Sequence, residues 1–202
     1  MKYAKTKHPI FGWDPYGTGC SYLPILAKCL KLFDGNVLEF GTGHHSSYLI
    51  CTVVDPPNRV LSFEHNSAWF DALNSKEYSP LIWKKPNQEV HLIDDPTGHD
   101  CEAWDAAYEY IDKDKWSLAF IDHGNVPRRG IEMSKLKDKV DVIIGHDSQG
   151  TGYGFEQAYP NFKYKYESYM HECRTVVVSN KYDISKLDLT KEDITKLLET
   201  EP

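Results

Sequence analysis

Short apolar runs alternate with polar or helix-like segments along most of the chain. Five of these runs are apolar at nearly every position, which is typical of strands buried on both faces of a parallel sheet. They cover residues 36–40, 59–64, 89–93, 117–122 and 141–147. Helical patterns lie between them, for example over residues 100–113. This alternation predicts an α/β fold in which helices cover both faces of a mostly parallel sheet.

The pattern changes towards the end of the chain. Residues 162–169 alternate aromatic and polar side chains, and the β-branched run 174–180 follows after a short turn. Such a pair predicts an antiparallel hairpin added to the parallel strands. The sequence therefore predicts a doubly wound, Rossmann-like sheet that ends in a hairpin.

The sequence predicts a helix before this core and another after it. Residues 21–36 have apolar positions at helical spacing and a Gly35–Asn36 stop signal, and residues 190–200 predict a closing helix. Thr190 and Asp193 resemble the capping box of that helix. We expect one domain over residues 1–202, with an N-terminal lid and helix (1–35), a core (36–180) and a C-terminal tail helix (181–202). The aromatic and glycine residues of segment 11–19 suit either a lid or a docked terminus.

Composition narrows the class of protein. The 202 residues are 41% hydrophobic and 26% charged, which are ordinary values for a globular domain. The net charge of −7 disfavours a nucleic-acid partner, because such proteins usually carry a basic face. Five scattered cysteines without C-x-x-C spacing favour a reducing compartment. With no signal peptide and no apolar run long enough to span a membrane, we expect a cytoplasmic protein without a membrane partner.

A glycine turn follows the first predicted strand. In a doubly wound sheet, ligands bind beyond the carboxyl ends of the strands, where Gly41, Thr42 and Gly43 lie. Glycines let a ligand approach the backbone closely, and the next helix can bind an anion at its N-terminus. Glu64 ends the second strand about 21 residues later, where a carboxylate can accept hydrogen bonds from both hydroxyls of a ribose. The pattern also matches the G-x-G-x-x-G turn of nicotinamide-binding domains, with Ser46 in the third place.

Three features favour another cofactor. Glu39 lies inside the first strand, where a carboxylate can face a cationic ligand. A predicted helix precedes this strand, whereas dinucleotide-binding domains commonly begin with the strand itself. The terminal hairpin also replaces the further crossover that a dinucleotide-binding domain would have.

Four segments together resemble the motifs of class I S-adenosylmethionine-dependent methyltransferases. They are VLEFGTG, VLSFEHNSAWF, LAFIDHG and VIIGHDS. The chain is most similar to a loosely characterised branch of this family that has EFG-G and S-EHN-W motifs. The resemblance extends from about Gly12 to Asn180. It implies a seven-stranded sheet with an antiparallel last strand, in agreement with the hairpin.

The resemblance also implies roles for individual residues, with S-adenosyl-L-methionine as the cofactor. The resemblance places four residues around the methionine part of the cofactor: Glu39, Gly41, Thr42 and Gly43. Glu64 would hold the ribose, with His65 and Asn66 along the adenosine. Asp94 or Asp95 would meet the adenine amine, and Asp122 would lie beside the sulfonium or the acceptor. For Trp69, the sequence favours contact with the adenine ring and packing in the hydrophobic core equally.

Asp122 and His123 end one predicted strand, and His146 and Asp147 end its neighbour. These four residues are the predicted catalytic group, because they share the edge of the glycine turn and a histidine suits a general base. Several O-methyltransferases of this fold place acidic metal ligands at these strand ends, which makes Mg²⁺ a candidate. No obvious third acidic ligand is present, so we predict that no metal is bound.

Other polar residues leave alternatives open. His44 and His45 diverge as neighbours on a helix and make a poor metal-binding pair. Arg128 and Arg129 suit either an anion clamp or a solvated loop, and Tyr153 is a candidate for touching the acceptor. The D-P-P-N segment 55–58 resembles a motif of base-modifying enzymes but precedes the second strand, where it predicts a turn.

The sequence thus predicts an S-adenosylmethionine-dependent methyltransferase that acts on an oxygen of a small-molecule or sugar-like acceptor. A nicotinamide-dependent (NAD(P)) oxidoreductase and a non-catalytic cofactor-binding protein are the alternatives. No Tyr-x-x-x-Lys dyad supports the oxidoreductase. The sequence makes no prediction about the oligomeric state.

Overall fold

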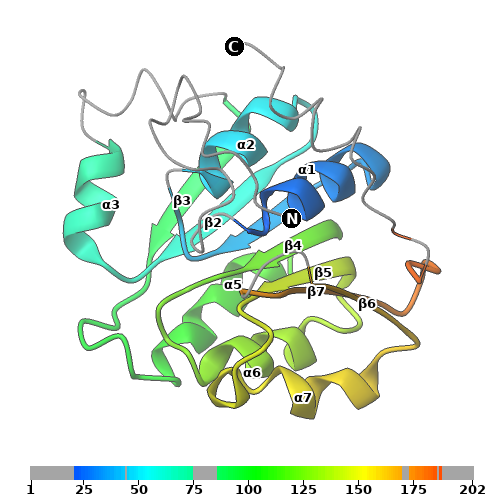
Figure 1. The fold of residues 1–202 in the computed structure, drawn as a ribbon. Coiled ribbons are helices and arrows are strands. Elements are labelled where there is room, and N and C mark those ends of the chain that lie inside the picture. The colour runs from blue at the N-terminus through cyan, green and yellow to red at the C-terminus, as the bar shows by residue number, and fades with distance from the viewer. Residues whose placement is uncertain (1–20, 44, 75–85, 170–172, 186, 188–202) are drawn as a thin grey trace, which may run out of the picture.

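The chain forms one seven-stranded sheet with helices on both faces (Figure 1). The computed structural model describes residues 21–43, 45–74, 86–169, 173–185 and 187. The strand order is β3-β2-β1-β4-β5-β7-β6. All pairs from β3 to β5 are parallel, whereas β7 is antiparallel to both β5 and β6. The predicted doubly wound sheet with a terminal hairpin is confirmed.

The strands lie within two residues of their predicted positions. They are β1 (Val37–Phe40), β2 (Val60–Glu64), β3 (Gln88–Leu92), β4 (Trp116–Ile121), β5 (Val140–His146), β6 (Tyr164–Ser168) and β7 (Thr175–Ser179). Every residue of β1, β2 and β7 is buried, as expected for strands covered on both faces. Register aligns Phe40 with Phe63 and with Ile121, so β1, β2 and β4 end level with one another.

Alternate residues of each strand face two separate cores. Leu38, Phe40 and Phe63 face one core, together with Trp104 and Met133. This side is covered by η2 (Ala103–Ala107), α5 (Tyr108–Ile111), α6 (Arg128–Lys135) and α7 (Phe155–Ala158). The intervening strand residues face the other core, beneath α1 (Leu23–Leu32) and α2 (Ser46–Val53). This alternation sends successive side chains at the carboxyl edge towards opposite sides of the sheet.

The helices differ more from prediction than the strands. The segment 100–113 is not one helix but the short 3₁₀ turn η2 followed by one turn of α-helix, α5. The predicted helix at 21–36 is shorter, as α1, and α3 (Ser67–Asn74) follows β2. Further 3₁₀ turns are η3 (Thr151–Tyr153) and η4 (Tyr159–Asn161). The proposed lid at 11–19 and the closing helix with Thr190 and Asp193 lie outside the described residues.

The turn predicted at 55–58 is present, with Asn58 N–H donating to the Asp55 carbonyl at 3.1 Å. It precedes β2 and is not at a strand's carboxyl end, as the sequence indicated.

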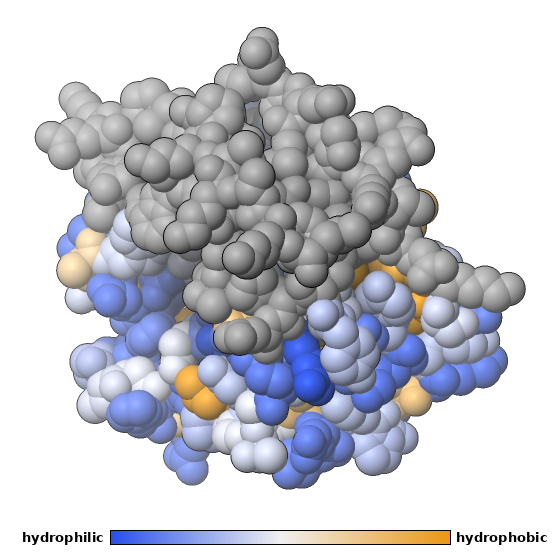
Figure 2. Space-filling model, in the orientation of Figure 1, coloured by the Kyte–Doolittle hydropathy of each residue, from blue (hydrophilic) through white to orange (hydrophobic). Residues whose placement is uncertain are grey.

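The described surface on the face shown in Figure 2 is mainly polar. In Figure 2 the coloured surface is mostly hydrophilic, with small separate apolar patches. The large exposed apolar side chains of the described residues come from distant elements: Leu32, Leu92, Ile131, Tyr169 and Tyr182. None of the helices within the described residues has both the length and the apolar composition that a membrane crossing requires.

The backbone of α6 touches the residue that joins η3 to α7, and both contact residues are glycines. A Cβ atom on Gly130 would lie 2.1 Å from the carbonyl oxygen of Gly154, which has a left-handed φ of +72°. Backbone atoms cannot rotate away as a side chain can, so this contact requires glycine at position 130.

We expect Gly130→Ala to destabilise the protein by about 1–3 kcal/mol, because α6 must move away from η3. Chemical denaturation would measure the loss in unfolding free energy. Gly152→Ala is the matched control, since its Cβ would be 3.9 Å from the nearest side-chain atom. Equal stability of the two variants would contradict the contact.

Candidate functional site

The turn between β1 and α2 is shaped by a close backbone crossing. Gly41 has a φ of +88°, which L side chains rarely adopt. A Cβ atom there would lie 2.5 Å from His123 Cα and 2.6 Å from its backbone nitrogen. Gly41 is therefore required for the chain after β1 to pass beside the chain after β4. The turn lies at the carboxyl edge, as predicted.

The peptide N–H groups of this turn bind groups of the protein itself. Thr42 N–H donates to Glu64 Oε2 at 3.0 Å, and Gly43 N–H donates to Ser47 Oγ at 3.0 Å. These two donors are therefore satisfied without a ligand. This differs from a dinucleotide-binding turn, in which the backbone approaches a pyrophosphate at the start of the helix.

Glu64 ties this turn to the end of β2. Its Oε2 also accepts the Thr42 hydroxyl at 2.6 Å, and its Oε1 accepts the backbone N–H groups of His65 at 2.9 Å and Asn66 at 2.8 Å. Burial alone would raise the pKa of Glu64, but these hydrogen bonds outweigh it and hold the pKa below its usual value. Glu64 is thus an ionised acceptor at the carboxyl edge.

Glu39 lies fully buried beneath the turn. Its carboxylate accepts the Ser47 hydroxyl at 2.9 Å and the Ser62 hydroxyl at 2.8 Å. Burial raises its pKa to about 7, although the serine hydrogen bonds oppose the shift. Because Ser47 also accepts the Gly43 N–H, Glu39 supports the turn through Ser47.

The residues after β2 lie against the turn. Trp69 donates its indole N–H to the Thr42 carbonyl at 3.1 Å, and its backbone N–H is accepted by the Asn66 side chain at 3.0 Å. Trp69 therefore packs across the turn from α3. His65 lies beside Gly98 and Gly124, where an added Cβ would be 3.3 Å and 2.8 Å from its ring. The Glu64 carboxylate, whose Oε1 lies 3.3 Å from His65 Nδ1, raises the pKa of His65, although burial opposes the shift.

The two aspartates after β3 differ in surroundings. Asp95 is buried and accepts the indole N–H of Trp104 and the amide of Asn125, both at 3.1 Å. Burial opposes ionisation, but these bonds and those from the following loop lower its pKa to about 2. Asp95 therefore organises its own loop. Asp94 is exposed, and it has no polar partner within the described residues.

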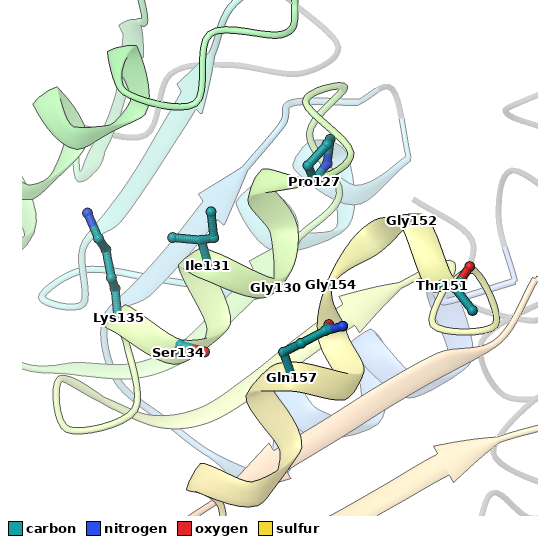
Figure 3. A pocket seen from close by; sticks show the side chains of 9 residues that line it. All are labelled: Pro127, Gly130, Ile131, Ser134, Lys135, Thr151, Gly152, Gly154 and Gln157. Carbon is teal, nitrogen blue, oxygen red and sulfur yellow. The ribbon is translucent and has the colours of Figure 1, made fainter.

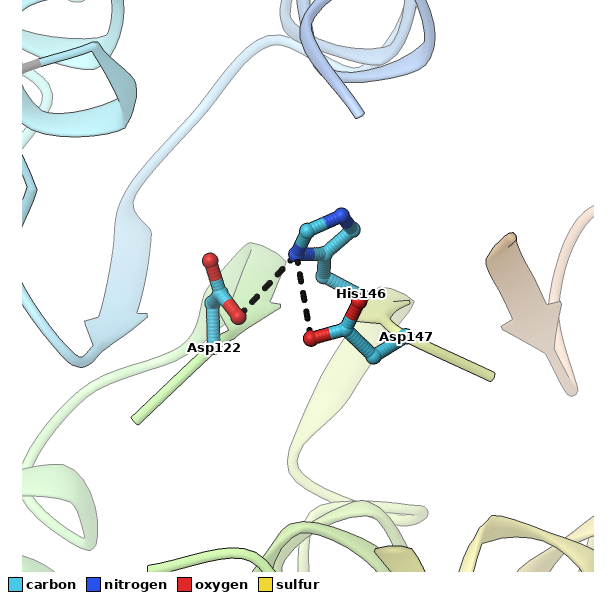
Figure 4. A group of neighbouring side chains, drawn as sticks. All are labelled: Asp122, His146 and Asp147. Carbon is cyan, nitrogen blue, oxygen red and sulfur yellow. Dashed lines mark hydrogen bonds and ion pairs between the residues drawn. The ribbon is translucent and has the colours of Figure 1, made fainter. Parts of the chain in front are cut away.

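Asp122, His146 and Asp147 meet at the ends of β4 and β5 (Figure 4). His146 Nδ1 lies 3.1 Å from Asp122 Oδ1 and 3.6 Å from Asp147 Oδ2. Its Nε2 lies 2.9 Å from the hydroxyl of Ser21, which donates to the Cys173 carbonyl at 2.7 Å. The second carboxylate oxygen of Asp122 points away from His146 in Figure 4. Three of the four predicted catalytic residues thus come together.

Asp147 adopts an unusual backbone conformation in this cluster. Its φ of +60° is in the left-handed region, which costs an L residue on the order of 1 kcal/mol. Among the described residues, it is the one non-glycine position with such a φ. This backbone conformation directs the carboxylate towards His146 and Arg129.

Arg129 completes the cluster from α6. Its Nη1 lies 2.9 Å from Asp122 Oδ1 and 3.2 Å from Asp147 Oδ2. It is buried, so it is neither a solvated loop residue nor an open anion clamp. The sequence did not predict this role. The order Asp-x₆-Arg after β4 was the available signal, but it does not specify where a long side chain ends.

His123 lies on the other side of the sheet from this cluster. Its ring stacks on Trp104, with centroids 4.2 Å apart and planes at 28°. Burial lowers its pKa well below the usual value, and neither ring nitrogen has a hydrogen-bond partner among the described groups. The structure therefore does not bring His123 to the other three predicted catalytic residues, because successive residues alternate in direction.

Arg128 and a groove on the surface both lie apart from the carboxyl edge of the sheet. Arg128 is buried and pairs with Glu132 and Asp105, so it is not a solvated residue either. A shallow, mostly apolar groove of about 500 Å³ lies between α6 and the η3–α7 segment (Figure 3). Its lining includes Ile131 and Gln157 but none of the predicted site residues.

No protein-family model and no curated protein sequence matches the chain. Solved structures do match it in fold. The O-methyltransferase from Bacillus cereus in complex with SAH is 16% identical, with 81% of each chain covered and a TM-score of 0.54. The O-methyltransferase TomG from Streptomyces achromogenes in complex with SAM is 13% identical, with 87% of this chain and 86% of that chain covered and a TM-score of 0.51.

A second class of enzyme has a similar fold. Spermidine synthase from Thermotoga maritima is 16% identical and covers 87% of this chain with a TM-score of 0.54. This chain spans 63% of the length of that structure. The likeness establishes the class I methyltransferase fold, and at these identities it extends no further than the fold.

The buried Glu39 makes a testable contribution to stability. A raised pKa means that the folded protein holds the proton after the unfolded chain has lost it. Stability therefore falls as pH rises from about 4.5 to about 7, by up to about 3 kcal/mol, and this penalty persists above that range.

We expect Glu39→Gln to gain stability relative to the natural protein as pH rises over this range. Denaturation at pH 5 and pH 8 would measure the difference, with the exposed Glu156→Gln as control. If the difference in unfolding free energy between Glu39→Gln and the natural protein were the same at both pH values, the buried carboxylate would not titrate as described.

Proposed function

We propose that this protein is an S-adenosylmethionine-dependent methyltransferase that acts on an oxygen of a small-molecule acceptor. The observation that carries the proposal is the arrangement of Glu64 and Asp122 along one sheet edge. Glu64 lies at the end of β2 beside the glycine turn, and Asp122 directly follows β4. β1 lies between these two strands, which suits a cofactor bound across its end.

The polar groups of this edge suit an adenosine. The Thr42 hydroxyl can rotate, so the Glu64 oxygen that it contacts at 2.6 Å can instead accept a ribose hydroxyl. Asp95 is fully engaged in its loop, which leaves the exposed Asp94 to accept the adenine amine. His65 and Asn66 would lie along the adenosine, as the motif resemblance implies.

The methionine part would lie at the glycine turn. Gly41 lets the turn pass beside the chain after β4, and Gly43 leads into α2, whose N-terminus favours a carboxylate. Glu39 holds this turn from beneath through Ser47, so we assign it a positioning role there.

The nicotinamide alternative is less well supported. The Thr42 and Gly43 N–H groups, which would face a pyrophosphate, are bound to Glu64 and Ser47. The antiparallel β7 between β5 and β6 also differs from the parallel order of dinucleotide-binding sheets. Both observations favour a cofactor without phosphate groups.

The acceptor would bind at the Asp122 side of the edge. The cofactor, when bound, supplies a methyl group carried on a sulfonium. Asp122 Oδ2, which is not used in the contacts to His146 or Arg129, can accept a hydrogen bond from the acceptor hydroxyl and take its proton. His146 and Asp147 hold this carboxylate and its surroundings in place. Tyr153, whose ring covers Arg129 at 4.8 Å, lies on the same side.

The acidic net charge supports a small molecule over a nucleic acid as the acceptor. We also propose a cytoplasmic location, because the five cysteines are scattered and have no C-x-x-C spacing, which favours a reducing compartment.

Titration calorimetry with S-adenosylhomocysteine tests the cofactor. We expect saturable binding, weakened about 10- to 100-fold in Glu64→Gln, because a neutral amide replaces the charged acceptor of the ribose hydroxyls. Glu89→Gln is the matched control, since Glu89 is an exposed carboxylate that pairs with Arg59 on the surface. Binding of NAD⁺ or NADH in place of the thioether would overturn the proposal and support the oxidoreductase.

The acceptor side is tested by methyl transfer from labelled S-adenosylmethionine to a panel of hydroxylated small molecules. Asp122→Asn should lower kcat by about 10²- to 10⁴-fold, because it removes the proton acceptor, while S-adenosylhomocysteine still binds. Full activity in this variant would exclude the assigned role. If the thioether binds but neither small molecules nor RNA are methylated, the non-catalytic cofactor-binding protein becomes the better account.

A further inference from the structure

The cluster at the ends of β4 and β5 has the ligand types of a divalent metal site. Asp122, His146 and Asp147 each offer one ligand atom, and these atoms lie within 4.8 Å of one another. Two carboxylates and an imidazole are a donor set that several divalent metals accept. The contacts of Arg129 decide whether a metal fits.

The guanidinium of Arg129 already contacts the oxygens that a metal would need. Its Nη1 lies 2.9 Å from Asp122 Oδ1 and 3.2 Å from Asp147 Oδ2. These are the same two oxygens that face His146 Nδ1. A metal would have to bind them at about 2.0–2.2 Å, next to a positive charge. The residues present therefore do not fit a metal ion together with Arg129.

Arg129 is held in this position by the ends of both strands. Its Nε donates to the His123 carbonyl at 2.8 Å, and its Nη1 donates to the His146 carbonyl at 3.1 Å. The ring of Tyr153 covers the guanidinium at 4.8 Å, and 7% of the side chain is exposed. A guanidinium stays charged at every relevant pH, so this is a permanent cation.

We propose that Arg129 supplies the cation of this cluster from the chain itself, so that Asp122 and Asp147 are positioned without a divalent metal. One guanidinium faces two carboxylates, which leaves a net negative charge on this pair of carboxylates. If the proposed function holds, Asp122 accepts the proton of the acceptor hydroxyl without the help of a metal ion. This consequence rests on the proposed function. Metal binding itself is measured without cofactor or acceptor, so its outcome is separate from that of the proposed function.

The test is calorimetric titration of the chelator-treated, full-length protein with Mn²⁺. We expect no saturable binding at the cluster in the natural protein or in Arg129→Lys, which keeps the charge. Arg129→Met, which keeps the apolar stem, should show saturable Mn²⁺ binding, at least about tenfold tighter than the weakest binding that the titration can detect. Adding Asp147→Asn to Arg129→Met should remove this binding.

Two results would overturn the proposal. One is Mn²⁺ binding by the natural protein that Asp147→Asn abolishes, which would show a metal site despite Arg129. The other is a folded Arg129→Met variant that gains no affinity for Mn²⁺. If Arg129→Met does not fold, the natural protein and Arg129→Lys decide the matter, because Mn²⁺ binding through Asp147 in either one contradicts the proposal.

Discussion

The hydrogen bonds of Glu64 fix the geometry on which the proposed cofactor site depends. One oxygen holds the turn after β1, and the other holds the first residues after β2. An ionised carboxylate makes stronger hydrogen bonds than a neutral acceptor, and burial protects them from competing water. The single side chain thus joins two strand ends and orders the turn between β1 and α2.

Buried or half-buried carboxylates recur along this edge, each with a different compensation. Glu39 has only serine hydroxyls, and its pKa rises to about 7. Asp95 has indole, amide and backbone donors, and its pKa falls to about 2. Asp122 and Asp147 share a guanidinium. For Glu39 and Asp95, the donors available, more than the depth of burial, set the direction of the pKa shift.

The sequence predicts the sheet closely because strand periodicity is a local signal. The strands buried on both faces are continuous apolar or β-branched runs, and β6 alternates, so all seven strands appear within two residues of their observed bounds. The helix at 100–113 was wrong because its apolar residues also suit a tight 3₁₀ turn around Trp104. Helix and 3₁₀ turn share most of their periodicity.

The candidate site was predictable where the backbone alone places a residue. Asp122, His146 and Asp147 directly follow or end neighbouring strands, so their convergence follows from topology. His123 failed to join them because alternation turns it to the opposite core. The place of Arg129 could not be read from sequence, since a side chain with four rotatable bonds can reach many partners. Likewise, adjacent Asp94 and Asp95 are distinguished only by tertiary contacts.

The backbone contact between Gly130 and Gly154 has a consequence for how acceptors are selected. This contact packs the segment that carries Tyr153 against α6. Arg129 lies beneath the Tyr153 ring and donates hydrogen bonds to the chain at the ends of β4 and β5. If the proposed acceptor binds here, this segment would form a preorganised wall that discriminates by fixed shape. Changing the acceptor range by engineering would then mean replacing side chains on this wall, because the backbones of Gly130 and Gly154 already touch.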